Sequence, residues 1–369
     1  MADEHPFGNT AMTDKQKGRL LVINVGSTTL KLGLFTGRDF RFREKIEYTP
    51  KEIAPLNTYG DWLHFLRDTV QRNLSTKKDH IDPLDLVVSR GGLTKPLAGG
   101  AYRVSRTMLE DLRSGSYGWH PTNIGPAIAR EIAMAHGVEA IVYDSPVVDE
   151  MSTLARFSGL KEIPRKAAFH VLNQKSAGRK AARSLNLPYE KSRLIVAHMG
   201  GGITVGAHSG GKIIDSTHGL SEGPFTPQRT GMLPNLDLMD LCFSGTYSKE
   251  ELRAMLLGRG GVFSYLGEQD MTKVEESISR GDRQALLVVE AMAYQISKNI
   301  CAMSAVLEGN VDAVVLTGSL CYFSTLVEEI RKRVSFRGVT LVYPGEDELE
   351  NLARGGLGVL TDGEEIREY

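Results

Sequence analysis

Two segments of this chain repeat one pattern: a strand, a glycine-bearing turn and a second strand. The first copy covers residues 19–35 and the second covers residues 193–208, with Arg19 aligned on Arg193 and Gly26 on Gly200. Short apolar runs joined through glycine turns are typical of β-hairpins. The repeat predicts an internally duplicated protein, in which each half presents a polar hairpin turn toward a cleft between the halves.

The composition is that of an ordinary globular protein. The chain has 369 residues, of which 41% are hydrophobic and 24% charged, and its formal net charge is -1. This balance argues against nucleic acid or an anionic membrane as the main partner. No apolar run approaches the roughly 18 residues that a membrane span needs. Cys242, Cys301 and Cys321 form no Cys-x-x-Cys pair, which is typical of free thiols in a reducing cytoplasm.

Strand-like and helix-like segments alternate along the chain, which predicts an α/β fold. The expected strands, besides the two hairpins, are 84–90, 141–144, 212–215 and 311–316. The expected helices are 61–74, 122–136 with Thr122 or Asn123 as its cap, 282–307 and 346–360. We expect a flexible extension at 1–18, a first domain at 19–173 plus 349–369, and a second domain at 174–348.

Three glycine turns are candidates for binding phosphate, because backbone amides and small hydroxyls at such turns cluster hydrogen-bond donors. They lie at 24–31, 199–203 and 317–319. For the first turn an ordinary polar hairpin is an equally good interpretation. A Walker-type loop at 206–212 is rejected, because Ile213 stands where a hydroxyl should bind magnesium. His198, His208 and His218 recur every ten residues, but their strand, turn and loop settings argue against a metal site.

Several segments together resemble the acetokinase family, and most closely its butyrate kinases, within the acetate kinase, sugar kinase and actin superfamily. The resemblance runs in order from residue 20 onward. Its segments are Asn24-Val-Gly-Ser-Thr-Thr-Leu-Lys31, Val88-Ser-Arg-Gly-Gly92, Ala168-Phe-His170, Asn173-Gln-Lys175, Ala197-His-Met-Gly-Gly-Gly202, Glu222-Gly-Pro-Phe225, Arg229-Thr-Gly231, Ala291-Met-Ala-Tyr-Gln-Ile296 and Tyr343-Pro-Gly-Glu-Asp-Glu348. It implies two ribonuclease-H-like domains around an ATP cleft, and reversible ATP-dependent phosphorylation of butyrate in the cytoplasm.

The resemblance also implies roles for single residues. The implied catalytic residues are Arg90, Asp144, His170 and Arg229. Those implied on the acyl substrate are Gly91, Gly92, His120 and Phe169. Those implied on the nucleotide and phosphate are Asn24, Ser27, Thr29, Lys31, His198, Gly200, Gly201, Gly202, Asp270 and Gly318. Magnesium is implied at Asn24 with Asp347 or Glu348, between which the alignment slips by one residue. ATP or ADP and Mg²⁺ are the expected cofactors, and a homodimer or higher homo-oligomer is the expected assembly.

Elementary chemistry accounts for these residue types. A carboxylate that attacks the γ-phosphorus of ATP brings one anion toward another, and two unit charges ~4 Å apart repel by ~4 kcal/mol at an effective dielectric near 20. Arginines, a histidine donor and magnesium offset this repulsion and align the attack. A carboxylate acceptor is already ionised at pH 7, so it needs no general base. We therefore expect Asp144 to position groups or to hold the water shell of the metal.

The sequence also bears on which carboxylic acid accepts the phosphoryl group. Acetate-specific relatives carry valines after the arginine that matches Arg90, so Gly91-Gly92 is expected to leave room for a longer acyl chain, with Phe169 as an apolar wall. Trp119 is expected either to shape that pocket or to cover a surface. Ser319 stands where a second glycine is expected, and would be strained if φ is positive there. The alternatives are a branched-chain fatty acid kinase and an actin-like nucleotide-binding regulator without transferase activity.

Overall fold

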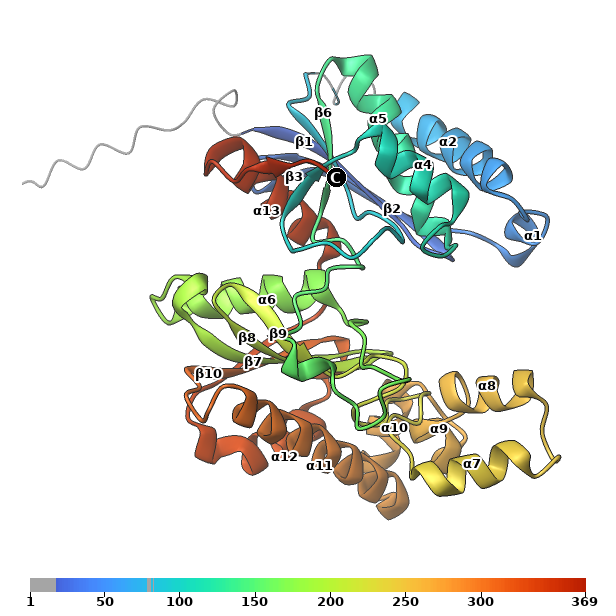
Figure 1. Cartoon of the computed structure of the whole chain (residues 1–369), viewed down its shortest axis with the longest axis vertical. Coiled ribbons are helices and arrows are strands. Elements are labelled where there is room, and N and C mark those ends of the chain that lie inside the picture. The colour runs from blue at the N-terminus through green and yellow to red at the C-terminus, as the bar shows by residue number, and fades with distance from the viewer. Residues whose placement is uncertain (1–17, 78–80, 82) are drawn as a thin grey trace, which may run out of the picture. The chain divides into compact units, whose positions relative to one another are not determined.

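The computed structural model describes residues 18–77, 81 and 83–369, so the expected extension at 1–18 lies outside the described residues except for Gly18. The chain divides into two compact units (Figure 1). Unit 1 comprises the residues up to Lys95, Gly100–Ser145 and Glu348–Tyr369, and unit 2 comprises Pro96–Gly99 and Pro146–Asp347. Each unit contains a sheet with helices packed on it, which confirms the predicted α/β fold.

Unit 1 is built on a seven-stranded sheet with the order β12-β5-β6-β4-β1-β2-β3. The strands are β1 (Arg19–Val25), β2 (Thr29–Thr36), β3 (Asp39–Glu47), β4 (Leu86–Ser89), β5 (Ala101–Arg103), β6 (Glu139–Tyr143) and β12 (Ile366–Arg367). The helices are α1 (Pro50–Ile53), α2 (Tyr59–Ser75), α4 (Arg106–Ser114), η2 (Pro121–Ile124), α5 (Gly125–His136) and α13 (Glu348–Thr361). β1, β2 and β3 form an antiparallel meander, and β4 pairs with β1 in parallel.

Unit 2 is built on a five-stranded sheet with the order β11-β10-β7-β8-β9. The strands are β7 (Arg193–Met199), β8 (Ile203–Ser209), β9 (Lys212–Ser216), β10 (Ala313–Gly318) and β11 (Thr340–Pro344). The helices are η3 (Leu154–Arg156), α6 (Val171–Ser184), η4 (Tyr189–Lys191), α7 (Asn235–Phe243), α8 (Lys249–Leu257), α9 (Gly261–Leu266), α10 (Met271–Ser279), α11 (Arg283–Val306), η5 (Ser319–Tyr322), α12 (Ser324–Val334) and η6 (Ser335–Arg337). Figure 1 shows α6 on one face of this sheet and α11 and α12 on the other.

The two sheets share one construction, as the repeated hairpin predicts. β7, β8 and β9 form an antiparallel meander and β10 pairs with β7 in parallel, as β4 does with β1. The correspondence extends to side chains. The amide of Arg19 donates to the Asp85 carboxylate at 2.7 Å, and the amide of Arg193 donates to that of Asp312, also at 2.7 Å. Each aspartate thus joins the start of the first strand of its meander to the start of the parallel strand, β4 or β10, by a hydrogen bond.

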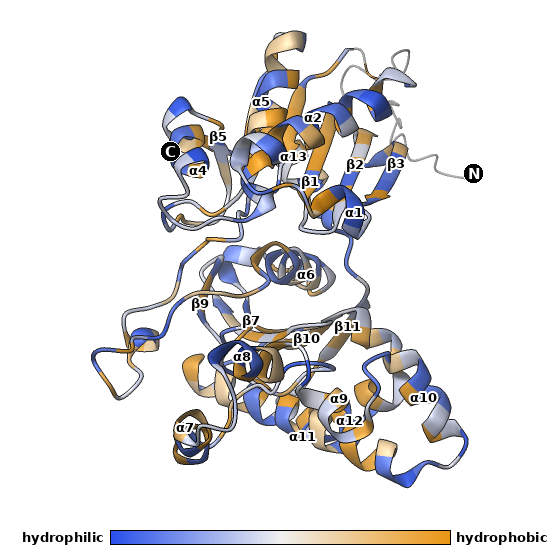
Figure 2. Cartoon of the chain, turned by 90° about the vertical axis from the view of Figure 1, so that its right-hand side faces the viewer, coloured by the Kyte–Doolittle hydropathy of each residue, from blue (hydrophilic) through white to orange (hydrophobic). Residues whose placement is uncertain are grey.

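Glycines let the last helix of unit 1 lie directly on the sheet. Gly355 and Gly356 weaken the prediction of a helix at 346–360, yet α13 runs through both. A Cβ on Gly355 would overlap the ring of Tyr143, and one on Gly356 would lie 2.7 Å from Val88. Close packing therefore outweighs the low helix propensity of glycine here. β1, which α13 also contacts, is apolar except for Arg19 and Asn24, and Figure 2 shows it largely in the colour of hydrophobic residues.

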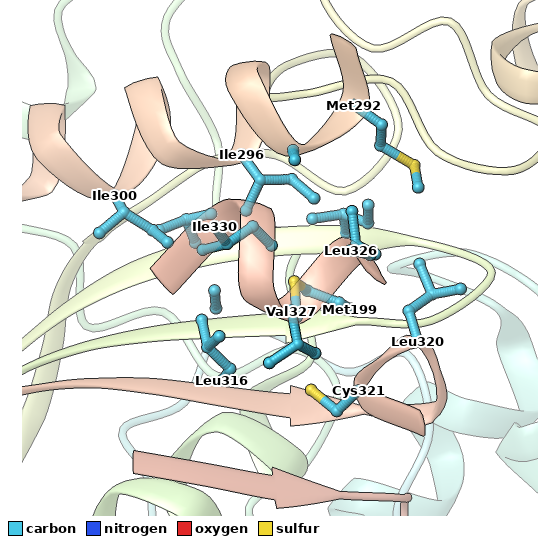
Figure 3. Close-up of a cluster of buried hydrophobic side chains, with 14 of the residues drawn as sticks. Met199, Met292, Ile296, Ile300, Leu316, Leu320, Cys321, Leu326, Val327 and Ile330 are labelled. Carbon is cyan, nitrogen blue, oxygen red and sulfur yellow. The ribbon is translucent and has the colours of Figure 1, made fainter. Parts of the chain in front are cut away.

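The core of unit 2 lies between its sheet and the helices α11 and α12. Figure 3 shows Ile296 and Ile300 of α11 facing Leu326 and Ile330 of α12, with Met199 of the sheet beside them. The predicted helix 282–307 is confirmed as α11, which begins after the cap Asp282. The apolar positions Val289, Ala293, Ile296, Ile300 and Met303, at steps of three and four residues, are buried, as an amphipathic helix requires.

The start of the predicted helix 122–136 differs from the expectation. Neither Thr122 nor Asn123 caps it. His120 caps the short helix η2 by accepting from the amide of Thr122 at 3.2 Å, and α5 continues from η2 without a side-chain cap. Both predicted cap residues are instead buried, and Thr122 donates to the carbonyl of Gly91 at 2.8 Å.

The first domain ends earlier than the predicted residue 173. Residues 146–173 pack with unit 2, where Val148, Met151 and Phe169 share a buried cluster with Ile213 of β9. Arg165 holds this segment in place by ion pairs with Asp215 and Glu222, both at 3.0 Å. No local sequence signal marks such a junction, because the contacts join residues that are far apart in the chain.

The helices α7 to α10 have no counterpart among the predicted elements. They form a helical segment between β9 and α11, drawn in yellow and orange in Figure 1. Within the described residues, no helix is long and apolar enough to cross a membrane.

Candidate functional site

In unit 1, the carboxylate of Glu348 contacts three other residues predicted from the sequence, Asn24, Lys31 and Arg90. Glu348, the first residue of α13, accepts from Asn24 Nδ2 at 2.9 Å and from Lys31 Nζ at 2.6 Å. Nη1 of Arg90, just after β4, lies 3.3 Å from the other carboxylate oxygen. Burial by itself would raise the pKa of Glu348, but Arg90, Lys31 and Asn24 together lower it below its ordinary value. Glu348 is therefore an ionised carboxylate among two cations.

The turn beside this cluster is tight and polar. The amide of Gly26 donates to the carbonyl of Thr29 at 2.7 Å, and Ser27 is exposed at the tip. Asn24 is buried, and its Oδ1 has no hydrogen-bond partner among the described residues. A buried amide oxygen without a partner is costly unless a ligand satisfies it. The turn therefore presents an acceptor next to an ionised carboxylate.

Asp144 lies at the carboxyl end of β6 in an unusual backbone conformation. Its φ is 41°, which few residues other than glycine adopt. The side chain is 1% exposed and its Oδ1 accepts from the amide of Gly100 at 2.9 Å, while the Asp144 amide donates to the Gly100 carbonyl at 3.1 Å. Such backbone strain persists where surrounding contacts impose it, and it clusters at functional sites.

The pair Gly91-Gly92 does not leave open space where its side chains would stand, which argues against the expectation that these glycines make room for a longer acyl chain. A Cβ on Gly91, whose φ is +90°, would lie 2.5 Å from Val142, and one on Gly92 would lie 2.7 Å from both Leu112 and the backbone of Asn123. Glycine stands at both positions because Val142, Leu112 and Asn123 already occupy the space that a side chain would need. The predicted wall Phe169 is likewise a buried member of the cluster around Val148 and Met151.

We expect Gly92→Val to destabilise unit 1 and to spare acyl selectivity. Overpacking against a fixed backbone atom should cost about 1–3 kcal/mol of unfolding free energy. Any loss of kcat/KM should be equal for acetate and butyrate. Urea unfolding and assays with both acids measure these effects, with Gly60→Val as the control, because a Cβ on exposed Gly60 meets only Thr58 Oγ1, at 3.6 Å. A loss of kcat/KM for butyrate alone, at unchanged unfolding free energy, would instead support an acyl pocket at Gly91-Gly92.

His120 and Trp119 are neighbours in the sequence with different surroundings. Burial, followed by the charge of Arg90, lowers the pKa of His120, so this predicted residue is a neutral imidazole in the electrostatic field of Arg90. Trp119 is 42% exposed and its ring lies 5.8 Å from that of Tyr59. This favours the interpretation that Trp119 covers a surface.

In unit 2, the three-glycine turn after β7 brings the predicted His170 and Arg229 together. A Cβ on Gly202 would lie 2.5 Å from Nη1 of Arg229 and 3.1 Å from Cε1 of His170. Nη1 of Arg229 donates to the carbonyl of Gly219 at 2.8 Å, and burial lowers the pKa of Arg229. No carboxylate among the described residues pairs with it. Arg229 is therefore a partly buried cation that lacks a counter-ion.

The other side of this turn carries His198 and a residue that the sequence analysis did not assign. His198 is 1% exposed, stacks on His170 with ring centroids 4.2 Å apart, and has its Nε2 3.2 Å from Glu346. Nδ1 of His198 is buried without a hydrogen-bond partner among the described residues. A Cβ on Gly200 would lie 2.6 Å from the Glu346 carboxylate. Glu346 belongs to the segment 343–348 of the family resemblance, which was the available signal.

The third predicted turn abuts the second. Gly318 has a φ of 99°, and a Cβ there would overlap the carbonyl of Met199. Ser319 is absent from the residues with positive φ and begins η5, so the expected strain at Ser319 is not present. Asp270 is the exposed cap of α10, and its side chain accepts from the amide of Thr272 at 2.9 Å. Capping α10 is a structural role that is sufficient to account for an aspartate at position 270.

The fold can be compared with that of solved structures. Two α/β sheets of one construction, each with glycine turns at the ends of its first strands, are shared with solved acetate and propionate kinases. Solved structures with this fold include acetate kinase from Porphyromonas gingivalis, at 20% identity and a TM-score of 0.76 over 93% of this chain and 100% of that one. Propionate kinase from Francisella tularensis matches at 17% identity and a TM-score of 0.71 over 92% and 98%.

The sequence itself also matches a family. The model of the acetokinase family covers residues 154–356, which is more than half of the chain. The chain belongs to the acetokinase family. Acetate kinase from Entamoeba histolytica is a further similar structure, at 18% identity and a TM-score of 0.69 over 92% of this chain and 98% of that one.

Proposed function

We propose that this protein transfers the γ-phosphoryl group of ATP to the carboxylate of a short-chain fatty acid, butyrate, and catalyses the reverse reaction from butyryl phosphate and ADP. A carboxylate oxygen forms a bond to the γ-phosphorus while the bond from that phosphorus to the bridging oxygen of ADP breaks. Membership of the acetokinase family supports the class of reaction. The acceptor and the roles of single residues are further parts of the proposal.

The observation that carries the proposal is the unbalanced charge at Arg229. The guanidinium of Arg229 is partly buried, has no carboxylate partner in the described part of the chain, and lies beside the imidazole of His170 and a three-glycine turn. This setting favours an anion with several oxygens. Backbone amides of such a turn add donors. We assign the phosphates of the nucleotide to this set, with His198, Gly200, Gly201 and Gly318 around it.

The set in unit 1 suits the acceptor end of the reaction. Arg90 and Lys31 are cations that Glu348 alone only partly balances, so a further anion such as a fatty acid carboxylate is attracted to them. His120 is neutral beside Arg90 and is assigned to the same acceptor. Asp144 is assigned a positioning task, because the acceptor carboxylate is ionised without a base.

The residues around Asn24 fit magnesium. The orphaned amide oxygen of Asn24 and the ionised carboxylate of Glu348 are hard oxygen donors, which Mg²⁺ prefers along with water. Glu348 is proposed over Asp347 because Glu348 is the residue that contacts Asn24. When bound, magnesium would neutralise phosphate charge. Lys31 and Arg90 hold the Glu348 carboxylate in its ionised form.

The choice of butyrate rests on the resemblance of the ordered segments, since the glycine pair no longer supports it. The test is hydroxamate formation from ATP, hydroxylamine and a panel of linear and branched acids from C2 to C6. Butyrate should give the highest kcat/KM. A maximum with isobutyrate or isovalerate would favour the branched-chain alternative, and one with acetate would leave only the reaction class. Nucleotide binding without hydroxamate from any acid would favour a regulatory protein.

Replacing either arginine by lysine should remove most of the activity. We expect Arg229→Lys and Arg90→Lys each to lower kcat/KM about 10²-fold, because an ammonium cannot donate a pair of parallel hydrogen bonds. Steady-state kinetics measure this, with Arg280→Lys as the control, since that side chain is 70% exposed. Activity near that of the control would mean that only net charge matters at these positions.

Self-association remains a prediction. Sedimentation velocity of the purified protein across a range of concentrations would measure it.

A further inference from the structure

A chain of buried polar side chains runs from His170 into the interior of unit 2. Its members are Thr204 of β8, Gln174 of α6, His208 of β8 and Tyr189 of η4, and each is at least nine-tenths buried. Buried polar groups persist when each has a partner, and a fully satisfied network fixes its own geometry. Nothing in the proposed reaction uses these four residues directly.

The contacts are continuous from one end to the other. Tyr189 Oη lies 2.8 Å from His208 Nδ1, and His208 Nε2 lies 3.1 Å from Gln174 Oε1. Gln174 Nε2 donates to Thr204 Oγ1 at 2.8 Å, and Thr204 Oγ1 lies 3.0 Å from His170 Nδ1. The chain thus consists of four hydrogen bonds, and the direction of each depends on its neighbour.

The direction follows from the groups that can only accept. Gln174 Oε1 has no proton, so His208 must donate from Nε2. Burial, with Lys175 and Arg179 adding to it, lowers the pKa of His208 to about 3, so the ring is neutral and its Nδ1 accepts from the Tyr189 hydroxyl. Gln174 Nε2 also lies 3.5 Å from the carbonyl oxygen of Thr204. This contact sets the orientation of the Gln174 amide, because in the flipped amide Oε1 would face that carbonyl oxygen. Thr204 then has its hydroxyl proton left for His170.

The backbone makes room for this chain. A Cβ on Gly206 would overlap Gln174 Oε1, and one on Gly178 would lie 2.9 Å from the Tyr189 ring and 3.1 Å from His208 Nδ1. Both glycines have ordinary φ angles, so close approach to these side chains is the physical reason for their lack of a side chain. Gly206 of β8 and Gly178 of α6 thus leave space for the buried chain of polar side chains.

We infer that this buried chain fixes the tautomer of His170. Thr204 donates to Nδ1, so the ring proton is held on Nε2, and Thr204, Gln174, His208 and Tyr189 are positioning residues. Because one hydrogen bond sets the next, reversing the Gln174 amide would reverse every link and move the proton of His170 to Nδ1. This further step rests on the proposed function: Nε2–H of His170 donates the hydrogen bond that an oxygen of the transferring phosphoryl group would accept.

The first test reads the tautomer and needs no substrate. Two-bond ¹H–¹⁵N spectra of the full chain labelled with ¹⁵N-histidine, with His170 assigned from His170→Gln, should show an unprotonated Nδ1 and a protonated Nε2 at pH 7.5. Thr204→Val keeps the shape and removes the hydroxyl, so the His170 signals should shift toward a mixture of tautomers. Thr204→Ser restores the hydroxyl and should restore the wild-type signals. A wild-type His170 protonated on Nδ1, or signals unchanged in Thr204→Val, would overturn the inference.

The second test separates this inference from the proposed function. Thr204→Val should lower kcat roughly tenfold, with KM for ATP and for the acid within about twofold, and Thr204→Ser should recover the rate. If the spectra change as expected while kcat does not, the chain orients His170 as inferred and the proposed role of His170 in transfer is wrong.

Discussion

Asp144→Asn is expected to fold like the wild type and to lose activity, with kcat lower by about 10²–10³-fold. Asparagine tolerates positive φ nearly as well as aspartate, and its side-chain oxygen can still accept from the Gly100 amide. The substitution therefore removes the charge and little else. Under the proposed positioning role, the variant should also need more magnesium for half-maximal activity. Kinetics against magnesium and pH measure both effects.

A control and an opposite outcome make this prediction sharp. Asp144→Ala loses the contact with Gly100 and places alanine at a φ of 41°, so it should lower the melting temperature, which Asp144→Asn should leave nearly unchanged. In the direction that phosphorylates butyrate, the wild type should show no acidic limb beyond that of butyrate itself. If an acidic limb near neutrality is present in the wild type, is lost in Asp144→Asn and leaves the magnesium requirement unchanged, Asp144 is a general base.

Lys175→Met is expected to lower the unfolding free energy by about 3–5 kcal/mol, because it leaves a buried carboxylate without its cation. Lys175 is 3% exposed and Glu150 is 5% exposed, and Nζ of Lys175 lies 2.7 and 2.9 Å from the two carboxylate oxygens. Glu150 also accepts from the amides of Gly99 and Ile213, at 2.8 and 2.9 Å. In the variant these two amides remain to solvate the charge of Glu150. Urea unfolding measures the loss.

Two variants test the cause. Lys175→Met combined with Glu150→Gln removes both charges and should recover a large part of the lost stability, since no buried charge is left unpaired. Lys45→Met breaks an exposed pair with Glu47, and should leave the unfolding free energy nearly unchanged. A loss for Lys175→Met as small as that for Lys45→Met would show that the buried pair does not stabilise unit 2.

The amino-acid sequence predicted the elements whose signals are local. The two hairpins, the α11 helix and the strands β4 and β10 follow from apolar periodicity and glycine turns, because hydrogen bonding within an element and burial of one face depend on neighbouring residues. The repeat of the hairpin predicted two sheets of one construction. The resemblance of the ordered segments also predicted the acetokinase family, to which the chain belongs.

Packing between distant residues decided the rest. The sequence pattern Gly91-Gly92 suggests empty space, whereas the tertiary structure fills that space with Val142, Leu112 and Asn123. The segment 146–173 joins unit 2 through contacts that span many residues of sequence.

By itself the sequence determined which residue types are available and where the chain turns, because both depend on local chemistry. Only the tertiary structure decided that Glu348 meets Asn24, Lys31 and Arg90, and that Gln174 connects His208 to Thr204. The partners of a buried charge or amide come from other elements of the fold, so their identity becomes visible only when the sheets and helices have packed.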